Sequence, residues 1–391
     1  MKPLFQQLAE RKGVADIRTP VSPTARLVAV GDLAFHGPLL EKVTGQTPGF
    51  IFEAVAADLQ AADVAVGNLE SVLIRHPYSP VSGKAFLVSG LGALDELKAA
   101  GFDVLTFANN HILDAGADGL TETLDGLAAA ALPTTGAGRT PEEARRPVRL
   151  SAAGLDFAVY SYSYGCGQIV GPGKPGCNAT DLKGIQADLR EFGRPGDLQV
   201  VCLHMDAEFQ ATPAPDRMDF CRRLADAGVQ MVLCHHPHVP QGMEVHNGSL
   251  IVYSLGNFVF PMMPYLMAAS PDCDKSFLLE VEVDREGPVG IRVVPVVLDA
   301  SGRPVPPQGE AHDQLLAMIA ERSAQLADPA LVRRNYLAMT TRYTRDLLRN
   351  IYWAVGERDW AKAKLFLGSL RVSNTHRRWV RHYFRDKLLG R

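Results

Sequence analysis

The chain has 391 residues, and its 40 lysine and arginine residues against 43 aspartate and glutamate residues give a formal net charge of −3. Hydrophobic residues make up 47% of the sequence, as in an ordinary globular protein, which argues against a disordered chain and against a nucleic-acid binder. A chain of this length can bury a large core, in one large domain or in a few smaller ones.

The sequence shows no signal that would direct the chain to a membrane or out of the cell. Charged residues lie in residues 1–20 where a signal peptide needs an apolar run, and no window is apolar for the roughly 20 residues of a spanning helix. Cys202, Cys221 and Cys234 lie within apolar patterns and no Cys-x-x-Cys pair occurs, which fits reduced, buried thiols. We therefore expect a cytoplasmic protein without an integral membrane segment.

Two early strands each end in a glycine that is followed by an acidic residue. Residues 26–30 (RLVAV) read as a short β-branched strand that ends at Gly31-Asp32. A carboxylate just past a strand end projects over the edge of the sheet, although Gly-Asp is equally a common turn dipeptide. A second strand at residues 63–66 ends in Gly-Asn-Leu-Glu, which places Glu70 in a similar position.

A third strand combines an amide and an imidazole at its end. Residues 91–100 have helical spacing and close at Gly101, and the strand at residues 102–107 leads to Asn110-His111. An asparagine oxygen can bind a metal ion while the neighbouring imidazole handles a proton. This strand end therefore adds a metal ligand and a proton-carrying group to the two carboxylates before it.

The strand at residues 198–203 ends in His204, and two carboxylates, Asp206 and Glu208, follow it on alternate residues. His204 is a further ligand of the type that divalent metals bind. Because Asp206 and Glu208 come directly after it, they are the candidates for a second proton-carrying group opposite the first.

Three histidines follow the buried strand expected at residues 229–234. They are His235, His236 and His238, and Pro237 restricts the turn that carries them. Two imidazoles one residue apart can bind one metal ion, or two ions that share a bridging ligand. Histidines near strand ends are often ordinary hydrogen-bonded groups, but the ligand-type residues at the ends of other strands favour a metal site.

The order of the elements indicates the fold class and three parts of the chain. Strands alternate with helices and are then followed by strands alone, which is the pattern of an α/β or α+β sandwich. After that, only helical patterns remain. We expect an arm at residues 1–25, an α/β domain at residues 26–305 and a helical extension at residues 306–391. The basic, aromatic tail at residues 371–391 is either a solvated helical face or a surface that grips an acidic peptide or phosphate groups.

Six residues at predicted strand ends make up the expected metal site. Carboxylate, amide oxygen and imidazole together suit two divalent cations, with one carboxylate able to bridge them. The identity of the ions is left open among Mn, Zn, Fe, Mg and Ca. The six residues are Asp32, Glu70, Asn110, His204, His236 and His238.

Several of these segments together resemble one family. The chain is similar, over roughly residues 26–300, to the CapA family of poly-γ-glutamate capsule biosynthesis proteins, a branch of the calcineurin-like metallophosphatase superfamily. The resemblance rests on VAVGDL, ADVAVGNLES, TFANNHILDAG, VLCHHPHVPQGMEV and LIVYSLGNFVF. It implies a calcineurin-like four-layered α/β/β/α metallophosphatase sandwich with a dinuclear site, to which this chain adds a C-terminal helical extension.

The resemblance also implies a role for each candidate residue. Asp32 and His238 would hold one ion. The other ion would be held by Asn110, His204 and His236. Glu70 would bridge the two, and His111 would handle the proton.

The first motif departs from the superfamily pattern. Ala34 stands where the superfamily has a histidine, and His36, two residues further on, is a candidate replacement. Met205-Asp206 stand where family members often have Trp-Gly. The missing histidine of the first motif leaves one ion with fewer ligands, which argues against ordinary phosphoesterase chemistry.

The family resemblance leaves more than one reaction open. Two metal ions can activate water for hydrolysis, or can stabilise the charge that develops when a proton leaves a carbon beside a carbonyl. CapA-like proteins include polyglutamate-related enzymes and epimerases of ribosomally made lasso peptides. We expect epimerisation of a residue in such a peptide, with His111, Asp206 and Glu208 as proton carriers. The alternatives are a metal-dependent hydrolase or biosynthesis protein for poly-γ-glutamate or a phosphoester, and a non-catalytic protein that binds capsule polymer.

Overall fold

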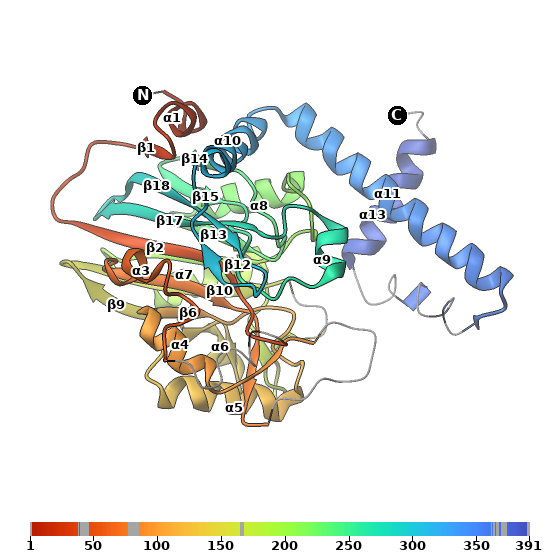
Figure 1. Cartoon of the computed structure of the whole chain (residues 1–391), viewed down its shortest axis with the longest axis horizontal. Coiled ribbons are helices and arrows are strands. Elements are labelled where there is room, and N and C mark those ends of the chain that lie inside the picture. The colour runs from red at the N-terminus through yellow and green to blue at the C-terminus, as the bar shows by residue number, and fades with distance from the viewer. Residues whose placement is uncertain are drawn as a thin grey trace.

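Two β-sheets lie face to face in the computed structural model of the chain, with helices on their outer faces (Figure 1). The mixed α/β architecture expected from the sequence is confirmed. The structure describes residues 2–37, 39, 47–76, 86–164, 168–360, 362, 364, 367–368 and 374–388.

The larger sheet is parallel at its centre and antiparallel toward one edge. β2 (Thr24–Leu33), β3 (Val64–Leu69) and β6 (Val104–Thr106) are parallel neighbours, so their carboxyl ends lie along one edge. The strands lie in the order β1 (Val14–Asp16), β18 (Gly287–Leu298), β17 (Lys275–Asp284), β2, β3, β6 and β7 (Thr134–Thr135), with β16 (Asn257–Val259) beside β2 and β19 (Pro304–Val305) beside β18.

The smaller sheet has the same polarity at its centre. Its strands lie in the order β14 (Met243–His246), β15 (Ser249–Val252), β13 (Met231–His235), β12 (Leu198–His204), β10 (Leu155–Ser163) and β9 (Val148–Ala152). All neighbours between β15 and β10 are parallel, and β14 and β9 close the edges antiparallel. Two further short pairs are β4 (Val72–Ile74) with β5 (Val88–Gly90), and β8 (Ala137–Gly138) with β11 (Gly176–Cys177).

The core between the two sheets follows from the alternation of side chains along each strand. Leu27 and Ala29 of β2 point inward and meet Val200 and Cys202 of β12, whereas Val28 between them points to the outer face. Helices cover both outer faces because each apolar outer face must be buried. The larger sheet carries α3 (Ala56–Gln60), α4 (Ala93–Ala100) and α5 (Gly116–Ala129), and the smaller sheet carries α7 (Leu182–Phe192) and α8 (Pro215–Asp226).

Two elements within residues 2–25, the segment expected as an arm, pack against the rest of the chain. β1 pairs with β18, and α1 (Leu4–Glu10) lies beside α10 (Glu310–Gln325) (Figure 1). Leu8 of α1 and Ile319 of α10 join the cluster between the sheets, because each presents an apolar face at the open edge of that core. The part of the helical extension that stands apart from this core therefore begins after α10. The three-part division at residues 25 and 305 remains a prediction.

The extension beyond α10 is a long helix with a second helix packed on it (Figure 1). α11 (Pro329–Gly356) begins with proline, and the Asp328 side chain accepts hydrogen bonds from two backbone N–H groups in its first turn. α13 (Asn374–Leu388) contacts α11 through Trp379, whose ring centroid lies 4.9 Å from that of Tyr343. Trp379 is buried, so the described part of the basic tail is more than a solvated face.

Short helices complete the described elements, namely α6 (Pro141–Arg145) and α9 (Pro264–Ala269). Within the described residues, no helix has both the length and the apolar character that spanning a bilayer requires. Residues 371–373 and 389–391 of the tail lie outside the described residues.

Close packing behind the first strand end explains the glycine in front of Asp32. The Asp32 N–H donates to the Gly256 carbonyl oxygen at 2.9 Å, and a Cβ on Gly31 would lie 2.0 Å from that same oxygen. Gly31→Ala is therefore expected to lower the free energy of unfolding by about 3 kcal/mol, at the upper end of overpacking effects, because only backbone can yield. Thermal unfolding would measure it. Gly171→Ala, whose Cβ would meet nothing within 4 Å, is the matched control. Equal melting temperatures for the two variants would contradict this packing.

Candidate metal centre

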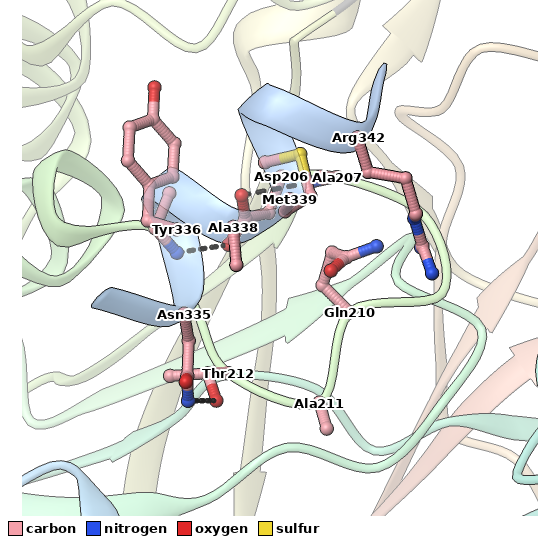
Figure 2. Close-up of a pocket in the computed structure, with 11 residues that line it drawn as sticks. Asp206, Ala207, Gln210, Ala211, Thr212, Asn335, Tyr336, Ala338, Met339 and Arg342 are labelled. Carbon is pink, nitrogen blue, oxygen red and sulfur yellow. Dashed lines mark hydrogen bonds between the residues drawn. The ribbon is translucent and has the colours of Figure 1, made fainter. Parts of the chain in front are cut away.

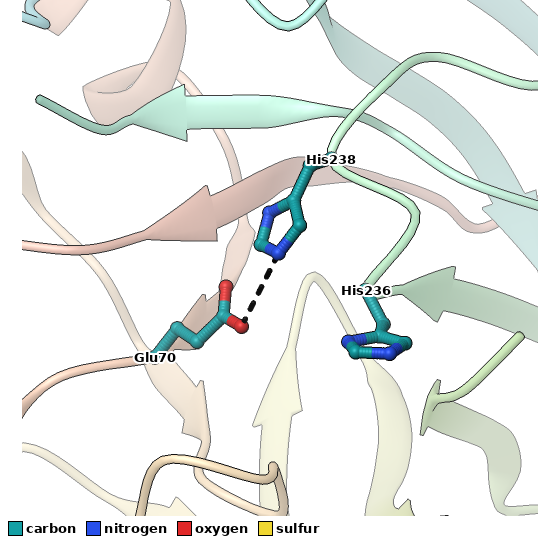
Figure 3. A group of neighbouring side chains, drawn as sticks. All are labelled: Glu70, His236 and His238. Carbon is teal, nitrogen blue, oxygen red and sulfur yellow. Dashed lines mark ion pairs between the residues drawn. The ribbon is translucent and has the colours of Figure 1, made fainter. Parts of the chain in front are cut away.

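The six expected ligands come from both sheets and meet where the strand ends of the two sheets face each other. Asp32 is near the end of β2, and Glu70 directly follows β3. His204 is the last residue of β12, and His236 and His238 follow β13. Figure 3 shows Glu70 extending from the larger sheet toward the two histidines of the smaller one. Parallel strand ends of two facing sheets thus bring together residues that are far apart in sequence.

Glu70 lies at the centre of this arrangement. Its Oε1 lies 3.3 Å from His204 Nε2, and 3.9 Å from both His238 Nε2 and His111 Nε2. The side chain is fully buried, and neither carboxylate oxygen has a hydrogen-bond partner among the residues that the structure describes. Burial first, and then the charge of Asp32, raise the pKa of Glu70 well above its usual value. An unpaired buried carboxylate is costly unless a cation compensates it.

One group of ligand atoms has the spacing of a shared ion. Asn110 Oδ1 lies 2.8 Å from His204 Nε2, which is the atom that faces Glu70. Two ligand atoms each about 2.1 Å from one ion lie roughly 3.0–3.4 Å apart at octahedral or tetrahedral angles. His236 is adjacent, since its ring centroid lies 4.7 Å from that of His204. These residues fit a divalent metal ion.

A second group overlaps the first through Glu70. Candidate ligand atoms of Glu70, His236 and His238 all lie within 4.8 Å of one another (Figure 3). Asp32 adjoins them, with Oδ2 at 3.7 Å from His238 Nδ1. Burial raises the pKa of Asp32, but the imidazole of His235 and its neighbours outweigh this effect and hold the pKa below its usual value. Asp32 is therefore charged, as a metal ligand must be.

Burial also sets the charge state of the histidines. It lowers the pKa of His236 to about 4, with Glu208 opposing the shift. It lowers the pKa of His204 well below its usual value, and His236 adds to this shift. Both imidazoles are therefore neutral at pH 7, which is the form that binds metal ions.

Asparagine side chains hold the surrounding groups in place. The Asn257 amide donates through Nδ2 to the Cys273 carbonyl oxygen at 3.0 Å, so its Oδ1 faces His238 Nδ1 at 2.9 Å. This leaves His238 Nε2 free to face Glu70. Asn68 orients Asp32 in a similar way, because its Nδ2 donates a hydrogen bond to Asp32 Oδ1 at 2.8 Å. Such outer partners orient metal ligands and raise their affinity.

His111 is held by a carboxylate on one side and faces the centre with the other. Its Nδ1 lies 2.6 Å from Asp114 Oδ2, and its backbone N–H donates to Asn109 Oδ1 at 3.0 Å. Nε2 is the atom directed toward Glu70, at 3.9 Å. An imidazole oriented in this way can give or take a proton at Nε2.

The two carboxylates after His204 have different surroundings. Both oxygens of Asp206 accept backbone hydrogen bonds, from Ala207 at 2.8 Å and from Ala214 at 2.9 Å, so this carboxylate holds its own loop together. Glu208 is exposed, and its charge acts on both Glu70 and His236. Glu208 thus lies at the solvent side of the centre.

The segment after Asp32 differs from the superfamily pattern, which has a histidine where this chain has Ala34. Ala34 is fully buried, and the ring of His36 packs edge-on against Phe260 with centroids 6.0 Å apart. Burial lowers the pKa of His36 to about 4, and the nearby charge of His111 adds to this shift. His36 therefore lies near His111, and the group formed by Glu70, His236 and His238 does not include it.

Strain in the backbone accompanies the site. His236 and His238 have φ values of 97° and 57°, and in the loop after His204 Asp206 and Phe209 have φ values of 95° and 62°. Residues other than glycine rarely adopt this left-handed conformation, and such residues cluster at functional sites. The Phe209 N–H donates to the Pro237 carbonyl oxygen at 2.8 Å, which ties the two strained loops together.

Five residues that contribute to the site were not among the expected site residues. Each contacts an expected residue, and three are asparagines within the strand-end motifs, which read equally well as turn residues. The only signal in the sequence was their place one to three residues from an expected site residue or at the end of another strand. They are Asn68, Asn109, Asp114, His235 and Asn257.

Comparison with known proteins gives related sequences that match about 60% of this chain. "PGA biosynthesis protein CapA" of Bacillus subtilis is 32% identical over 236 residues, 59% of this chain and 62% of that protein. "Capsule biosynthesis protein CapA" of Bacillus anthracis is 28% identical over 258 residues, 64% of this chain and 63% of that protein. A "Probable polyglutamine synthesis accessory protein" of Mycobacterium tuberculosis is 29% identical over 265 residues, 61% of this chain and 68% of that protein. The matched segment thus spans less than two thirds of the length of the two CapA proteins.

The site and the family assignment agree. A solved structure, TT1561 of Thermus thermophilus, matches 67% of this chain and 95% of that chain at 10% identity and a TM-score of 0.35, which is too distant to bear on the fold. The family described as "Bacterial capsule synthesis protein PGA_cap" matches residues 26–262, which include all six expected ligands. The match covers more than half of the chain and confirms the resemblance to CapA proteins, so this chain belongs to the bacterial capsule synthesis (PGA_cap) family.

Proposed function

We propose that this chain is a divalent-metal-dependent enzyme that acts on a peptide or polyglutamate-like substrate, and that its reaction is epimerisation. The main support is Glu70, a fully buried carboxylate that has no hydrogen-bond partner within the described part of the chain and lies among imidazole and amide groups. The resemblance to poly-γ-glutamate capsule biosynthesis proteins supports a glutamate-rich chain as substrate. A ribosomally made peptide of the lasso type is the narrower form of this proposal. The proposal includes the calcineurin-like four-layered α/β/β/α sandwich as the fold.

The proposed metal ligands divide between two ions. Asp32 and His238 would hold one ion. Asn110, His204 and His236 would hold the other, with Glu70 as the shared carboxylate; the 2.8 Å and 3.3 Å spacings around His204 support the grouping of Asn110, His204 and Glu70. A divalent ion bound there supplies a Lewis acid for a carbonyl or carboxylate oxygen.

The residues of the chain itself carry the proton. His111, with Nδ1–H donated to Asp114, takes the α-proton of the substrate at Nε2. Glu208, which is exposed and whose charge acts on His236, is the group proposed to return a proton to the opposite face of the α-carbon. Asp206 acts in this scheme by holding the loop that carries Glu208, because both of its oxygens accept backbone hydrogen bonds.

Hydrolysis, or another step in making poly-γ-glutamate, is the second candidate function. It is favoured by the names of the two CapA relatives and uses the same ligands, with His111 donating a proton to the leaving group. Non-catalytic polymer binding is the third. The carboxylate–imidazole pair of Asp114 and His111 argues against it, because binding alone requires no oriented proton carrier.

Incubation of the metal-loaded protein with a glutamate oligomer in heavy water distinguishes these functions. Epimerisation predicts one deuteron at an α-carbon, D-glutamate on chiral analysis and no change in oligomer length. The same mixture with a chelator is the control. Shortened products without α-deuteration would replace epimerisation by hydrolysis, and intact oligomer without exchange would contradict both.

A further inference from the structure

Two neighbouring cavities lie along α11, on the far side of the loop that follows His204. The first, of about 330 Å³, lies between residues 206–214 and α11 (Figure 2). The second, of about 680 Å³, continues along α11 itself. Ala338 and Arg342 line both, so the two cavities adjoin.

Arginines dominate the charge of these cavities. Arg342, Arg345 and Arg349 line the second cavity at spacings that place them on one face of the helix. Arg349 is paired with Asp346 at 2.9 Å. Arg342 and Arg345 are exposed and have no ion pair or hydrogen bond within the part of the chain that the structure describes. Two guanidinium groups therefore face the cavities without a partner among the described residues, and Asp346, which also lines the second cavity, is paired with Arg349.

Asp206, the one carboxylate among the described residues that line the first cavity, is engaged by the backbone. Asp206 uses both oxygens to accept the Ala207 and Ala214 N–H groups, so its acceptor positions turn toward the backbone. Figure 2 shows the Arg342 side chain reaching toward the loop beside Gln210. The open part of the cavity is thus lined by a cation and by neutral polar groups.

A single loop separates these cavities from the metal centre. On one side of it, the Phe209 ring stacks on His238 with centroids 5.9 Å apart. On the other side, Thr212 Oγ1 accepts a hydrogen bond from Asn335 Nδ2 of α11 at 3.1 Å. A ligand in the cavities would therefore lie one loop away from the centre.

We propose that these cavities form a subsite for a polycarboxylate chain, such as an acidic peptide with a carboxylate on every residue. Arg342 to Arg349 spans seven residues, or about 10 Å of helix, so the charges are spread along a line and do not converge on one small anion. Carboxylates on one side of an extended chain recur about every 7 Å, and guanidinium groups bind carboxylates in bidentate fashion. The subsite lies partly on α11, outside residues 26–262.

The biological role of this subsite rests on the proposed function, because the subsite would hold the substrate beside the metal centre. The binding of an acidic chain does not depend on that function. Binding can be measured without turnover. The probe is a fluorescein-labelled decamer of L-glutamate, followed by anisotropy with the full-length protein, once with metal and once with a chelator. Arg342→Gln combined with Arg345→Gln is expected to raise Kd by on the order of tenfold or more, because two charge-assisted contacts are lost.

The matched control is Arg333→Gln combined with Arg334→Gln. These arginines are exposed on α11 and line neither cavity, so Kd should stay within about twofold. An equal loss in both double variants, an unchanged Kd in the first, or equal binding of a labelled glutamine decamer would each overturn the subsite. Loss of turnover with this binding intact would instead count against the proposed reaction and leave the subsite standing.

Discussion

Glu70→Gln is expected to lose bound metal and, in the metal-free protein, to raise the free energy of unfolding. The first effect follows because Glu70 is the one carboxylate shared by both ligand groups. The second follows because a fully buried carboxylate without a hydrogen-bond partner destabilises the fold when no cation is bound. Elemental analysis measures the first effect, and chemical unfolding in a chelator measures the second. Glu53→Gln, at a side chain that is 73% exposed, is the control and should change neither.

The stabilisation of the metal-free protein should depend on pH in a defined direction. Burial and Asp32 raise the pKa of Glu70 in the folded chain well above its usual value of 4.5. Below pH 4.5 both folded and unfolded chains carry the proton, so wild type and Glu70→Gln should be similarly stable. Above it the unfolded chain releases its proton first, and wild type loses up to about 1.4 kcal/mol per pH unit until the folded pKa is passed. A difference that does not change with pH, or full metal occupancy in the variant, would refute this account of Glu70.

His111→Ala is expected to lower kcat by about 10²–10⁴-fold while both KM and metal content stay close to those of wild type. Metal should be retained because His111 is not among the proposed ligands: its Nε2 lies 3.9 Å from Glu70, whereas Asn110 and His204 supply ligand atoms only 2.8 Å apart. Asp114→Asn should lower kcat less, because the imidazole remains but loses the carboxylate that orients it.

His246→Ala is the control for these variants. His246 pairs with Asp226 at 2.8 Å on the surface, so its loss should leave kcat unchanged. If His111→Ala lost metal to the same extent as activity, His111 would be a ligand and not a proton carrier.

The ends of strands were the predictable part of this molecule. A polar residue directly after a buried strand lies at the carboxyl end of that strand, and parallel strands place these ends along one edge of the sheet. Asp32, Glu70, His204, His236 and His238 therefore meet in the structure as the strand pattern indicated.

Contacts between distant segments were not predictable. Asn257 and Asn68 follow glycine in motifs that read as turns, and only the folded chain shows that they orient His238 and Asp32. The packing of α1 and the first cavity were unpredictable for the same reason. α1 packs against α10, and the first cavity is completed by α11, so each depends on a helix from the C-terminal third of the chain. No local pattern specifies which partner a helix face will meet.

The loop from Met205 to Ala214 is a wall common to the metal centre and the arginine-lined cavities. Phe209 touches His238 on one side of it, and Thr212 bonds to α11 on the other. Any coupling between binding events on the two sides of this loop is reciprocal. If the metal ions tighten the hold of the cavities on an acidic chain by about tenfold, that chain must tighten the hold on the metal ions by the same factor. Metal retention during dialysis would then report on substrate affinity, even for a ligand that is never turned over.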